Sequence, residues 1–309
     1  MRCSLSRCEV DRLMTSTGAA AWRVARCGTV SDKADSDFRS WLADGCNASM
    51  TWLADKADMR RDPSLLLSGA TSVIVAAFPY RPAGESPRPR MAISLYALGR
   101  DYHAVLRERL APVAEAIDAA CGSQSRICVD SAPLRERYWA VEAGLGRIGR
   151  NNLLLVPELG SMLFLGSILT TARIEPDSPL PPSAHPCADC DAPCVRACPT
   201  HAIRPDSTVD ARRCLAYLTI EHRGQLPEGT RLHGRVFGCD ACALACPHNR
   251  QPLPPGQPLP DFAPLPETMS LDADELTTMS RRAFARRFAH SPLSRARTET
   301  LLRNLRHDD

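Results

Sequence analysis

Eight cysteines between positions 187 and 246 are the residues of this chain best suited to chemistry. Seven of them form two compact runs, Cys187-x2-Cys190-x3-Cys194-x3-Cys198-Pro199 and Cys239-x2-Cys242-x3-Cys246-Pro247, with Cys214 between the runs. Thiolates are soft ligands, and three of them on one short loop can wrap an iron–sulfur cubane. The proline ends each run and directs its last cysteine toward the other cluster. The spacing therefore predicts two 4Fe-4S clusters.

The same logic assigns four thiols to each cluster. One set is Cys187, Cys190, Cys194 and Cys246, and the other is Cys198, Cys214, Cys239 and Cys242. Three residues, Asp191-Ala192-Pro193, separate the second and third cysteines, where the bacterial ferredoxin run has two. We expect the extra residue either to bulge outward with ligation intact or to weaken the first cluster. Structural zinc is the alternative, but the repeated C-x3-C-P ending favours clusters.

The other six cysteines are scattered through the first half of the chain, and we expect them to be mostly small buried hydrophobic residues. They are Cys3, Cys8, Cys27, Cys46, Cys121 and Cys128. A secreted disulfide scaffold is not expected, because such chains are usually short and carry a signal peptide. The first residues, MRCSLSRCEVDRLMTSTG, have charges every few positions and no apolar core of a signal peptide.

Two further segments carry candidate acids. Asp130 ends an apolar run, and a partly buried carboxyl at a strand end can stay protonated and act as an acid; the alternative is a turn aspartate. Asp101-Tyr102-His103 resembles the start of the Asp-x-His-x-x-Gly motif by which some cobalamin enzymes bind cobalt. Leu106 replaces the glycine, so cobalt ligation by this histidine is unsupported. Asp101 is either the N-cap of the next helix or part of a site rim.

A glycine-rich segment, Gly144-Leu145-Gly146-Arg147-Ile148-Gly149, fits the dinucleotide-binding fingerprint. That fingerprint must follow a strand and open a helix. Here the segment follows a helix-like stretch, 135–143, and precedes a strand starting near Asn152. We therefore expect a helix C-terminus with its glycine stop and no nicotinamide site.

Helices and strands must position the cysteines and the candidate acids. Residues 1–60 have a helical pattern, as do 103–120 and the tail 271–309, while 71–78, 126–129, 152–156 and 162–169 are typical of strands. Residues 157–160 suggest a hairpin turn between the last two strands. Proline-rich connectors span 175–186 and 252–266. The prediction is an α+β or α/β protein with an N-terminal catalytic α/β domain (1–175), a ferredoxin-like two-cluster module (176–250), and a connector with a short helical tail (251–309).

Composition narrows the class of protein. The chain has 309 residues, 44% hydrophobic and 24% charged, which excludes wholesale disorder, and no apolar run reaches the roughly 18 residues of a membrane helix. The net charge is only +3, but eight arginines and the single acid Glu299 give residues 281–306 a charge of 8 − 1, or +7. Arg281, Arg282, Arg286 and Arg287 are expected in pairs along one helix side, extended by Arg295, Arg297, Arg303 and Arg306. Such a segment attracts phosphates; a solvated helix face is the alternative.

Several motifs together resemble the epoxyqueuosine reductase family. They are Arg61-Asp62-Pro63, Tyr96-Ala97-x-Gly99-x-Asp101-Tyr102-His103, Val129-Asp130-Ser131-Ala132-Pro133-Leu134, Ala143 to Asn151, Tyr217 to Gly224, and Gly238-Cys239-Asp240-x-Cys242-x3-Cys246-Pro247. The resemblance extends from about residue 40 to residue 305. It implies a cytoplasmic enzyme that reduces epoxyqueuosine to queuosine at the wobble position of tRNA, using cobalamin and two 4Fe-4S clusters.

The resemblance also implies roles for single residues. Asp130 would be the proton donor, and Tyr102 and His103 would line the cobalamin site with it. Arg61, Arg150 and Asn151 are further candidates for cobalamin contact. The partners implied are tRNA and an external low-potential electron donor, with no membrane, and we expect a monomer. Longer family members continue into helical repeats, so tRNA contact is expected from the arginine-rich tail and the rim of the active site.

Two other functions are compatible with parts of the sequence. One is a cobalamin-dependent oxidoreductase resembling reductive dehalogenases, or a corrinoid-reducing electron carrier, in either case without an RNA substrate. The other is a non-enzymatic electron-transfer subunit, in which the Asp130 segment would be purely structural. The arginine-rich tail favours the RNA substrate, because a small organic substrate gives no reason for eight arginines there.

Overall fold

The computed structural model describes residues 4–181 and 185–307, so Cys3 lies outside the described residues. A four-stranded antiparallel sheet forms the centre of the first part, in the order β2 (Ala21–Arg26), β3 (Ser72–Pro79), β8 (Leu163–Thr170) and β5 (Ser125–Cys128). β3 is buried along its whole length, as its continuous apolar run predicts. β2 lies in a region whose pattern predicted only helices. β5 is an edge strand with Cys128 as its one buried residue, although the apolar residues at 126–129 are also typical of a strand buried on both faces.

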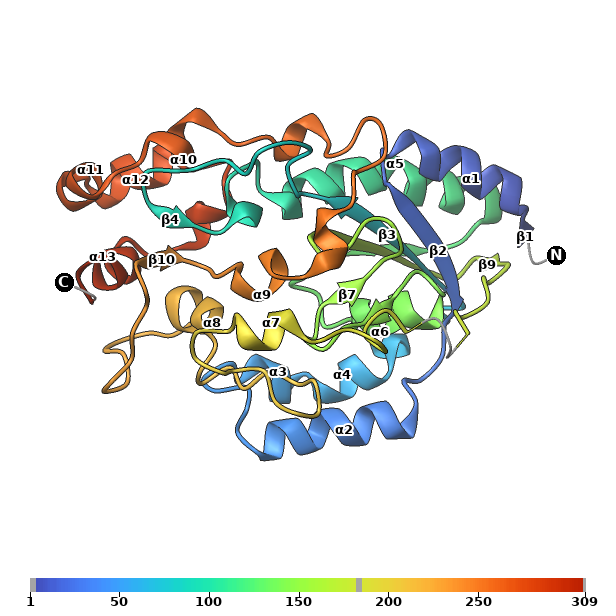
Figure 1. Cartoon of the computed structure of the whole chain (residues 1–309). Coiled ribbons are helices and arrows are strands. Elements are labelled where there is room, and N and C mark those ends of the chain that lie inside the picture. The colour runs from blue at the N-terminus through green and yellow to red at the C-terminus, as the bar shows by residue number, and fades with distance from the viewer. Residues whose placement is uncertain (1–3, 182–184, 308–309) are drawn as a thin grey trace.

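Helices cover both faces of this sheet (Figure 1). α1 (Arg7–Ser16) and α5 (Tyr102–Cys121) pack on the face of Ile74, Ala76 and Phe78. α6 (Glu136–Glu142) packs on the opposite face, against Val73, Val75 and Ala77. The alternation along β3 thus divides the core into two layers, which is the two-residue period of a strand.

The glycine-rich segment is the end of a helix, as predicted. α6 ends before Gly144, which has φ of +74°, and β6 (Arg147–Ile148) follows. The carbonyl oxygen of Ser178 lies where a Cβ on Gly144 would be placed, so glycine is required by space as well as by φ.

The predicted hairpin at 157–160 is wrong in its pairing. A tight turn is present, closed by hydrogen bonds between Val156 and Gly160. β7 (Leu154–Leu155) pairs with β6, however, while β8 pairs with β3 and β5. β8 is buried on both faces over most of its length, and such a strand belongs in the middle of a sheet.

The cysteine-rich segment is held between the first part and the tail. It contains α7 (Pro193–Arg196), α8 (Leu215–Ile220), β10 (Arg235–Phe237) and α9 (Ala241–Leu244), and β10 pairs in parallel with β4 (Ala92–Ile93). α2 (Asp32–Ala43), α3 (Trp52–Asp55) and α4 (Ala57–Arg61) lie beneath it in Figure 1. The indole of Trp41 donates to the carbonyl of Val209 at 2.9 Å, which ties α2 to the segment.

The tail is helical, as predicted, and forms α10 (Pro266–Ser270), α11 (Ala273–Thr278), α12 (Arg281–Arg287) and α13 (Thr298–His307). Phe284, Phe288 and Leu293 of the tail form one apolar cluster with Leu98 and Phe237. A short pair, β1 (Ser4–Leu5) with β9 (Arg173–Ile174), lies at the opposite end of the molecule in Figure 1. Across the described residues, no helix combines the length and apolar character needed to cross a membrane.

Candidate active site

Asp101, His103 and Asp130 form a hydrogen-bonded chain where α5 begins beside the end of β5. Asp101 caps α5 by accepting from the N–H of His103 at 3.0 Å, so the N-cap expectation is confirmed. Its Oδ1 lies 2.7 Å from Nδ1 of His103, and Nε2 of that ring lies 3.2 Å from Oδ2 of Asp130. The cap fixes the first acid, and the first acid orients the imidazole toward the second.

The charges of this chain follow from its contacts. Burial opposes ionisation of Asp101, but its hydrogen bonds with His103 and the charges of His103 and Arg295 lower its pKa to about 2. An ionised carboxylate only accepts, so Nδ1 of His103 carries a proton and Nε2 is the nitrogen that exchanges one with Asp130. Burial lowers the pKa of His103, but hydrogen bonds with Asp101 and Asp130 raise it more.

Asp130 lies in a strained turn. Its φ is +52°, and the N–H of Ser131 donates to the carbonyl of Val129 across it. The side chain is 64% exposed. Desolvation by the surrounding protein raises its pKa, but hydrogen bonds from His103 and Tyr102 and the charge of Arg295 bring the pKa below its ordinary value. The lowered pKa of Asp130 favours its carboxylate form, and the raised pKa of His103 favours the protonated imidazole.

A line of aromatic rings leads away from this chain. Tyr102 hydrogen-bonds Asp130 and stacks on Phe164 with ring centroids 4.3 Å apart, and Phe164 contacts Tyr80 at 4.7 Å. Burial raises the pKa of Tyr80 well above its ordinary value, and the charges of Asp240 and Cys242 raise it further. Tyr80 thus lies close enough to a predicted cluster ligand to sense its charge, and the aromatic line connects that thiol with the acid centre.

Glu136 supports the turn from the first residue of α6. Its Oε2 accepts from the N–H of Asp130 at 2.9 Å, while its Oε1 is buried without a partner. Burial and the charge of Asp130 raise the pKa of Glu136 well above its ordinary value, although the Asp130 N–H, Arg137 and Arg60 lower it. The buried Nε of Arg60 is also unpartnered. Sequence reasoning missed both residues; the available signals were that Glu136 lies six positions after Asp130 and that Arg60 directly precedes Arg61.

We expect Glu136→Gln to raise the melting temperature at pH 8 and to leave it nearly unchanged at pH 4. The folded pKa of Glu136 lies above the ordinary value of 4.5, so its stabilisation is complete below pH 4.5 and is lost as pH rises toward the folded pKa. The amide cannot ionise and still accepts the Asp130 N–H. Thermal unfolding across this pH range checks it, with Glu142→Gln, exposed on the same helix, as the matched control. A pH-independent difference would contradict burial as the cause.

Arg150 contacts the first cysteine run, and Asn151 follows Arg150 in the chain. An Nη2 of Arg150 donates to the carbonyl of Cys187 at 3.2 Å. Asn151 is buried, with its Oδ1 accepting from the N–H of Leu153 at 3.4 Å and its Nδ2 left without a partner. This corner therefore offers a buried amide donor next to the predicted first cluster.

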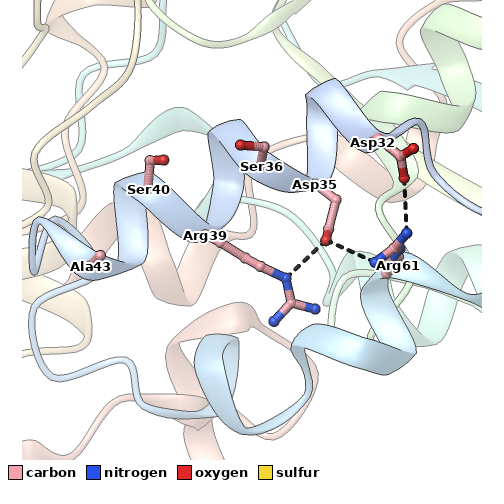
Figure 2. A pocket seen from close by; sticks show the side chains of 7 residues that line it. All are labelled: Asp32, Asp35, Ser36, Arg39, Ser40, Ala43 and Arg61. Carbon is pink, nitrogen blue, oxygen red and sulfur yellow. Dashed lines mark hydrogen bonds and ion pairs between the residues drawn. The ribbon is translucent and has the colours of Figure 1, made fainter.

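Arg61 is not brought to this centre. It pairs with Asp32 at 2.9 Å and Asp35 at 3.6 Å, in an open pocket of about 530 Å³ between α2 and α4 (Figure 2). The pocket holds none of the acid chain. Its neighbour Arg60 instead senses the charges of Asp130 and Glu136. Of the predicted site residues, the structure thus joins Tyr102, His103 and Asp130, places Arg150 at the first cysteine run with Asn151 buried next to it in the chain, and leaves Arg61 apart.

The charges that act on two of the cysteines agree with the two predicted sets, which stay a prediction. Burial raises the pKa of Cys194, and neighbouring Cys246, Cys187 and Cys190 raise it further. In the same way, burial and then Cys214, Cys239 and Cys198 raise the pKa of Cys242 to about 12, with a smaller contribution from Cys194. In the described residues, no three His, Cys, Asp or Glu side chains are grouped tightly enough to hold a single metal ion. These charge effects thus agree with two neighbouring sets of thiols.

The extra residue of the first run is accommodated in a turn. Ala192 has φ of +58° and ψ of +51°, and α7 begins at Pro193 directly after it. Asp191 is exposed and pairs with Arg196 at 2.6 Å, whereas Cys194 is buried. The geometry therefore favours the outward bulge, with both flanking cysteines kept in one set.

Comparisons with known proteins agree with these motifs. Residues 60–131 match the family model "Epoxyqueuosine reductase QueG, DUF1730", and residues 186–249 match a 4Fe-4S double cluster binding domain. An epoxyqueuosine reductase of Gloeobacter violaceus is 40% identical over 92% of this chain and 89% of that protein. An epoxyqueuosine reductase of Pseudomonas aeruginosa is 39% identical over 88% of this chain and 76% of its own length.

Solved structures extend the likeness to three dimensions. A crystal structure of epoxyqueuosine reductase with an epoxyqueuosine-modified tyrosine tRNA stem loop has a TM-score of 0.86 and 28% identity, covering 96% of this chain and 79% of that one. The enzyme from Bacillus subtilis, described with its aspartate catalytic loop swung out of the active site, has a TM-score of 0.82 and 26% identity over the same shares. The 4Fe-4S double cluster domain therefore holds the eight thiols described above.

Proposed function

The chain belongs to the epoxyqueuosine reductase family, and we propose that it reduces epoxyqueuosine to queuosine at the wobble position of tRNA. The observation that carries this proposal is the Asp101–His103–Asp130 chain, built from residues of the family's motifs and placed beside two thiol sets. Removing an epoxide oxygen needs two electrons and protons on the departing oxygen. The protein is an oxidoreductase in which the thiol sets would bind the groups that transfer electrons, and the acid chain would transfer protons.

The clusters require the eight cysteines as ligands. One 4Fe-4S cluster is assigned to Cys187, Cys190, Cys194 and Cys246, and the other to Cys198, Cys214, Cys239 and Cys242. Support comes from the mutual influence within each set and from backbone donors, such as the N–H of Ala202 at 3.2 Å from the sulfur of Cys198. When bound, the clusters supply electrons one at a time, received from an external low-potential donor.

Cobalamin fits the polar groups left unsatisfied around the centre. A corrin carries amide arms, and the buried Nδ2 of Asn151 and the unpartnered Nε of Arg60 are donors for such groups. We assign the binding surface to Tyr102, His103, Asp130, Arg150 and Asn151, with Arg60 in place of Arg61. When bound, cobalamin supplies the two-electron reduction at carbon. His103 faces Asp130 rather than standing apart as a metal ligand, which agrees with the missing glycine of the cobalt-binding motif.

Proton delivery is assigned to the residues themselves. Asp101 holds Nδ1–H of His103, Nε2 passes a proton to Asp130, and Asp130 donates it to the departing oxygen. Closure of the site by substrate removes the water around the exposed carboxyl of Asp130. That desolvation raises its pKa and moves the proton from His103 to the acid that donates it.

We propose the same three segments that the sequence predicts, and the structure adds contacts between them. Residues 1–175 carry the acid chain, 176–250 the thiols and 251–309 the connector and tail. β10 pairs with β4, and Asn304 of the tail donates to the carbonyl of Val236, so the three segments pack as one body. We propose that the protein works as a monomer in the cytoplasm.

The tail is proposed to bind tRNA phosphates, but with fewer arginines than the sequence suggests. Arg281 pairs with Glu299, Arg287 pairs with Glu275, and Arg303 donates to the carbonyls of Leu218, His222 and Gly224. Arg282 and Arg286 are exposed on α12. These two arginines are therefore an exposed pair on one helix that is available to phosphates.

Changing Arg282 and Arg286 together to glutamine is expected to weaken stem-loop binding and to reduce the slope of log affinity against log salt by about 1 per lost contact. Fluorescence anisotropy at several salt concentrations measures both. The control is Arg12→Gln with Arg173→Gln, which removes the same charge from the end of the molecule that carries the N-terminus. Equal slopes for the two double variants would remove α12 from the RNA surface.

The proposed function itself is tested with protein reconstituted anaerobically with iron, sulfide and cobalamin. With a low-potential reductant and an epoxyqueuosine stem loop, the modified nucleoside should lose one oxygen atom, as detected by mass spectrometry after digestion. Optical spectra should show cluster and corrin bands in the same preparation. An unchanged nucleoside with both cofactors bound would overturn the proposal.

A further inference from the structure

The segment that follows α12 contacts the N-terminus of α5. The N–H of Asp101 donates to the carbonyl of His290 at 2.7 Å, and Ser291 and Leu293 are almost fully buried. Leu293 packs in the apolar cluster that also contains Ala97 and Leu98. A short 3₁₀ helix, Pro292–Arg295, is thereby anchored beside the acid centre and presents its last residue to it.

That last residue contacts the acid chain. Nη2 and Nε of Arg295 lie 3.3 and 3.4 Å from Oδ2 of Asp101, while Oδ1 of the same carboxylate is engaged by His103. Asp101 is 15% exposed and Arg295 is 51% exposed. The charge of Arg295 also lowers the pKa of Asp130 and of His103. Within the described residues, Arg295 is the residue of the tail that forms an ion pair with the acid chain.

We propose that Arg295 is a positioning residue for the Asp101–His103–Asp130 chain and that its exposed edge receives a phosphate of the substrate RNA. A guanidinium has five N–H donors in a planar fork, and only the Nε and Nη2 edge faces Asp101. The other edge remains for a phosphate, the group that such a fork binds best. The phosphate part of this inference rests on the proposed function, whereas the contact with the acid chain does not.

One consequence is visible without turnover. Arg295→Gln removes a positive charge that lowers the pKa of His103, so the imidazole should titrate at higher pH than in the wild type. The other groups acting on this centre are unchanged by the substitution: Arg60, Tyr96, Tyr102, Glu136, Arg137 and Glu221. The measurement is NMR of histidine-labelled cluster-loaded protein, with the His103 signal assigned by its loss in His103→Gln.

Arg297→Gln is the matched control. Arg297 is exposed and lies two positions after Arg295, and its substitution removes the same charge. It should leave the His103 titration at its wild-type position. Arg295→Lys keeps the charge without the fork, so His103 should titrate nearly as in the wild type. Coincident titrations of Arg295→Gln and Arg297→Gln would overturn the positioning role.

Turnover then tests the coupling to RNA. At saturating stem loop, Arg295→Gln should lower the single-turnover rate at least tenfold more than Arg297→Gln does, and Arg295→Lys should lower it severalfold. Both glutamine variants should weaken stem-loop binding. Equal rates for the two glutamine variants would overturn the coupling. If the wild type leaves the nucleoside unreduced, the proposed function fails, and the titrations still decide whether Arg295 acts on the centre.

Discussion

Asp130→Asn is expected to bind cobalamin and keep both clusters, yet to lose turnover by about a hundredfold or more. The amide has no acidic proton to place on the departing oxygen. Asparagine tolerates a left-handed φ, so it suits the turn at +52°, and its backbone N–H can still donate to Glu136. Single-turnover rates with the epoxyqueuosine stem loop, together with cluster and corrin spectra, measure the effect.

A second substitution separates a chemical role from a structural one. His103→Gln should also slow turnover, and the double variant should be no slower than Asp130→Asn alone, because residues that act as one unit have non-additive effects. Additive losses would mean that His103 does not work through Asp130. Normal turnover of Asp130→Asn would make Asp130 only a turn residue.

Cys246→Ala is expected to halve the iron and acid-labile sulfide of the anaerobically prepared protein, from about eight of each per chain to about four. Cys246 lies in the second run, but the proposed assignment places it with Cys187, Cys190 and Cys194 some fifty residues upstream, whose charges act on it. The lost cluster should therefore be the one whose other ligands are in the first run. Electron paramagnetic resonance of the reduced protein should show one cluster signal in place of two interacting ones.

Cys8→Ala provides the matched control, because Cys8 is an exposed thiol on α1, away from the two runs. It should keep about eight irons and both signals. Full iron content in Cys246→Ala would overturn the assignment of this ligand. Stoichiometric zinc without sulfide in the wild type would overturn the clusters altogether.

The pairing of the thiols shows what local spacing can determine. Two or three residues between cysteines leave a short loop few ways to present its sulfurs, and a following proline ends the run. For this reason, the two sets could be proposed from the sequence before any contact was known, and the charges acting on Cys194 and Cys242 agree with that proposal. The capping role of Asp101 was equally local, since a cap is made within one helical turn.

The pairing of the strands could not be predicted from the local sequence pattern. The segments 152–156 and 162–169 flank a genuine turn, yet they join different sheets, because a strand buried on both faces takes the centre of the main sheet. β2 was missed because residues 21–26 are bordered by helical patterns on both sides. Only its partner β3 makes it a strand.

The description of the acid centre depended on both the sequence and the tertiary structure. The resemblance of short sequence motifs to a known family proposed Asp130, His103 and Tyr102 as site residues. Tertiary structure alone decided that Arg60 rather than Arg61 faces the centre, that Glu136 supports the Asp130 turn, and that Arg295 reaches Asp101 across 194 positions of sequence. It also determined the direction in which the pKa of each group of the acid chain is shifted. A pKa depends on every charge and hydrogen bond within a few ångströms, and those neighbours are chosen by packing of distant segments, which sequence spacing does not encode.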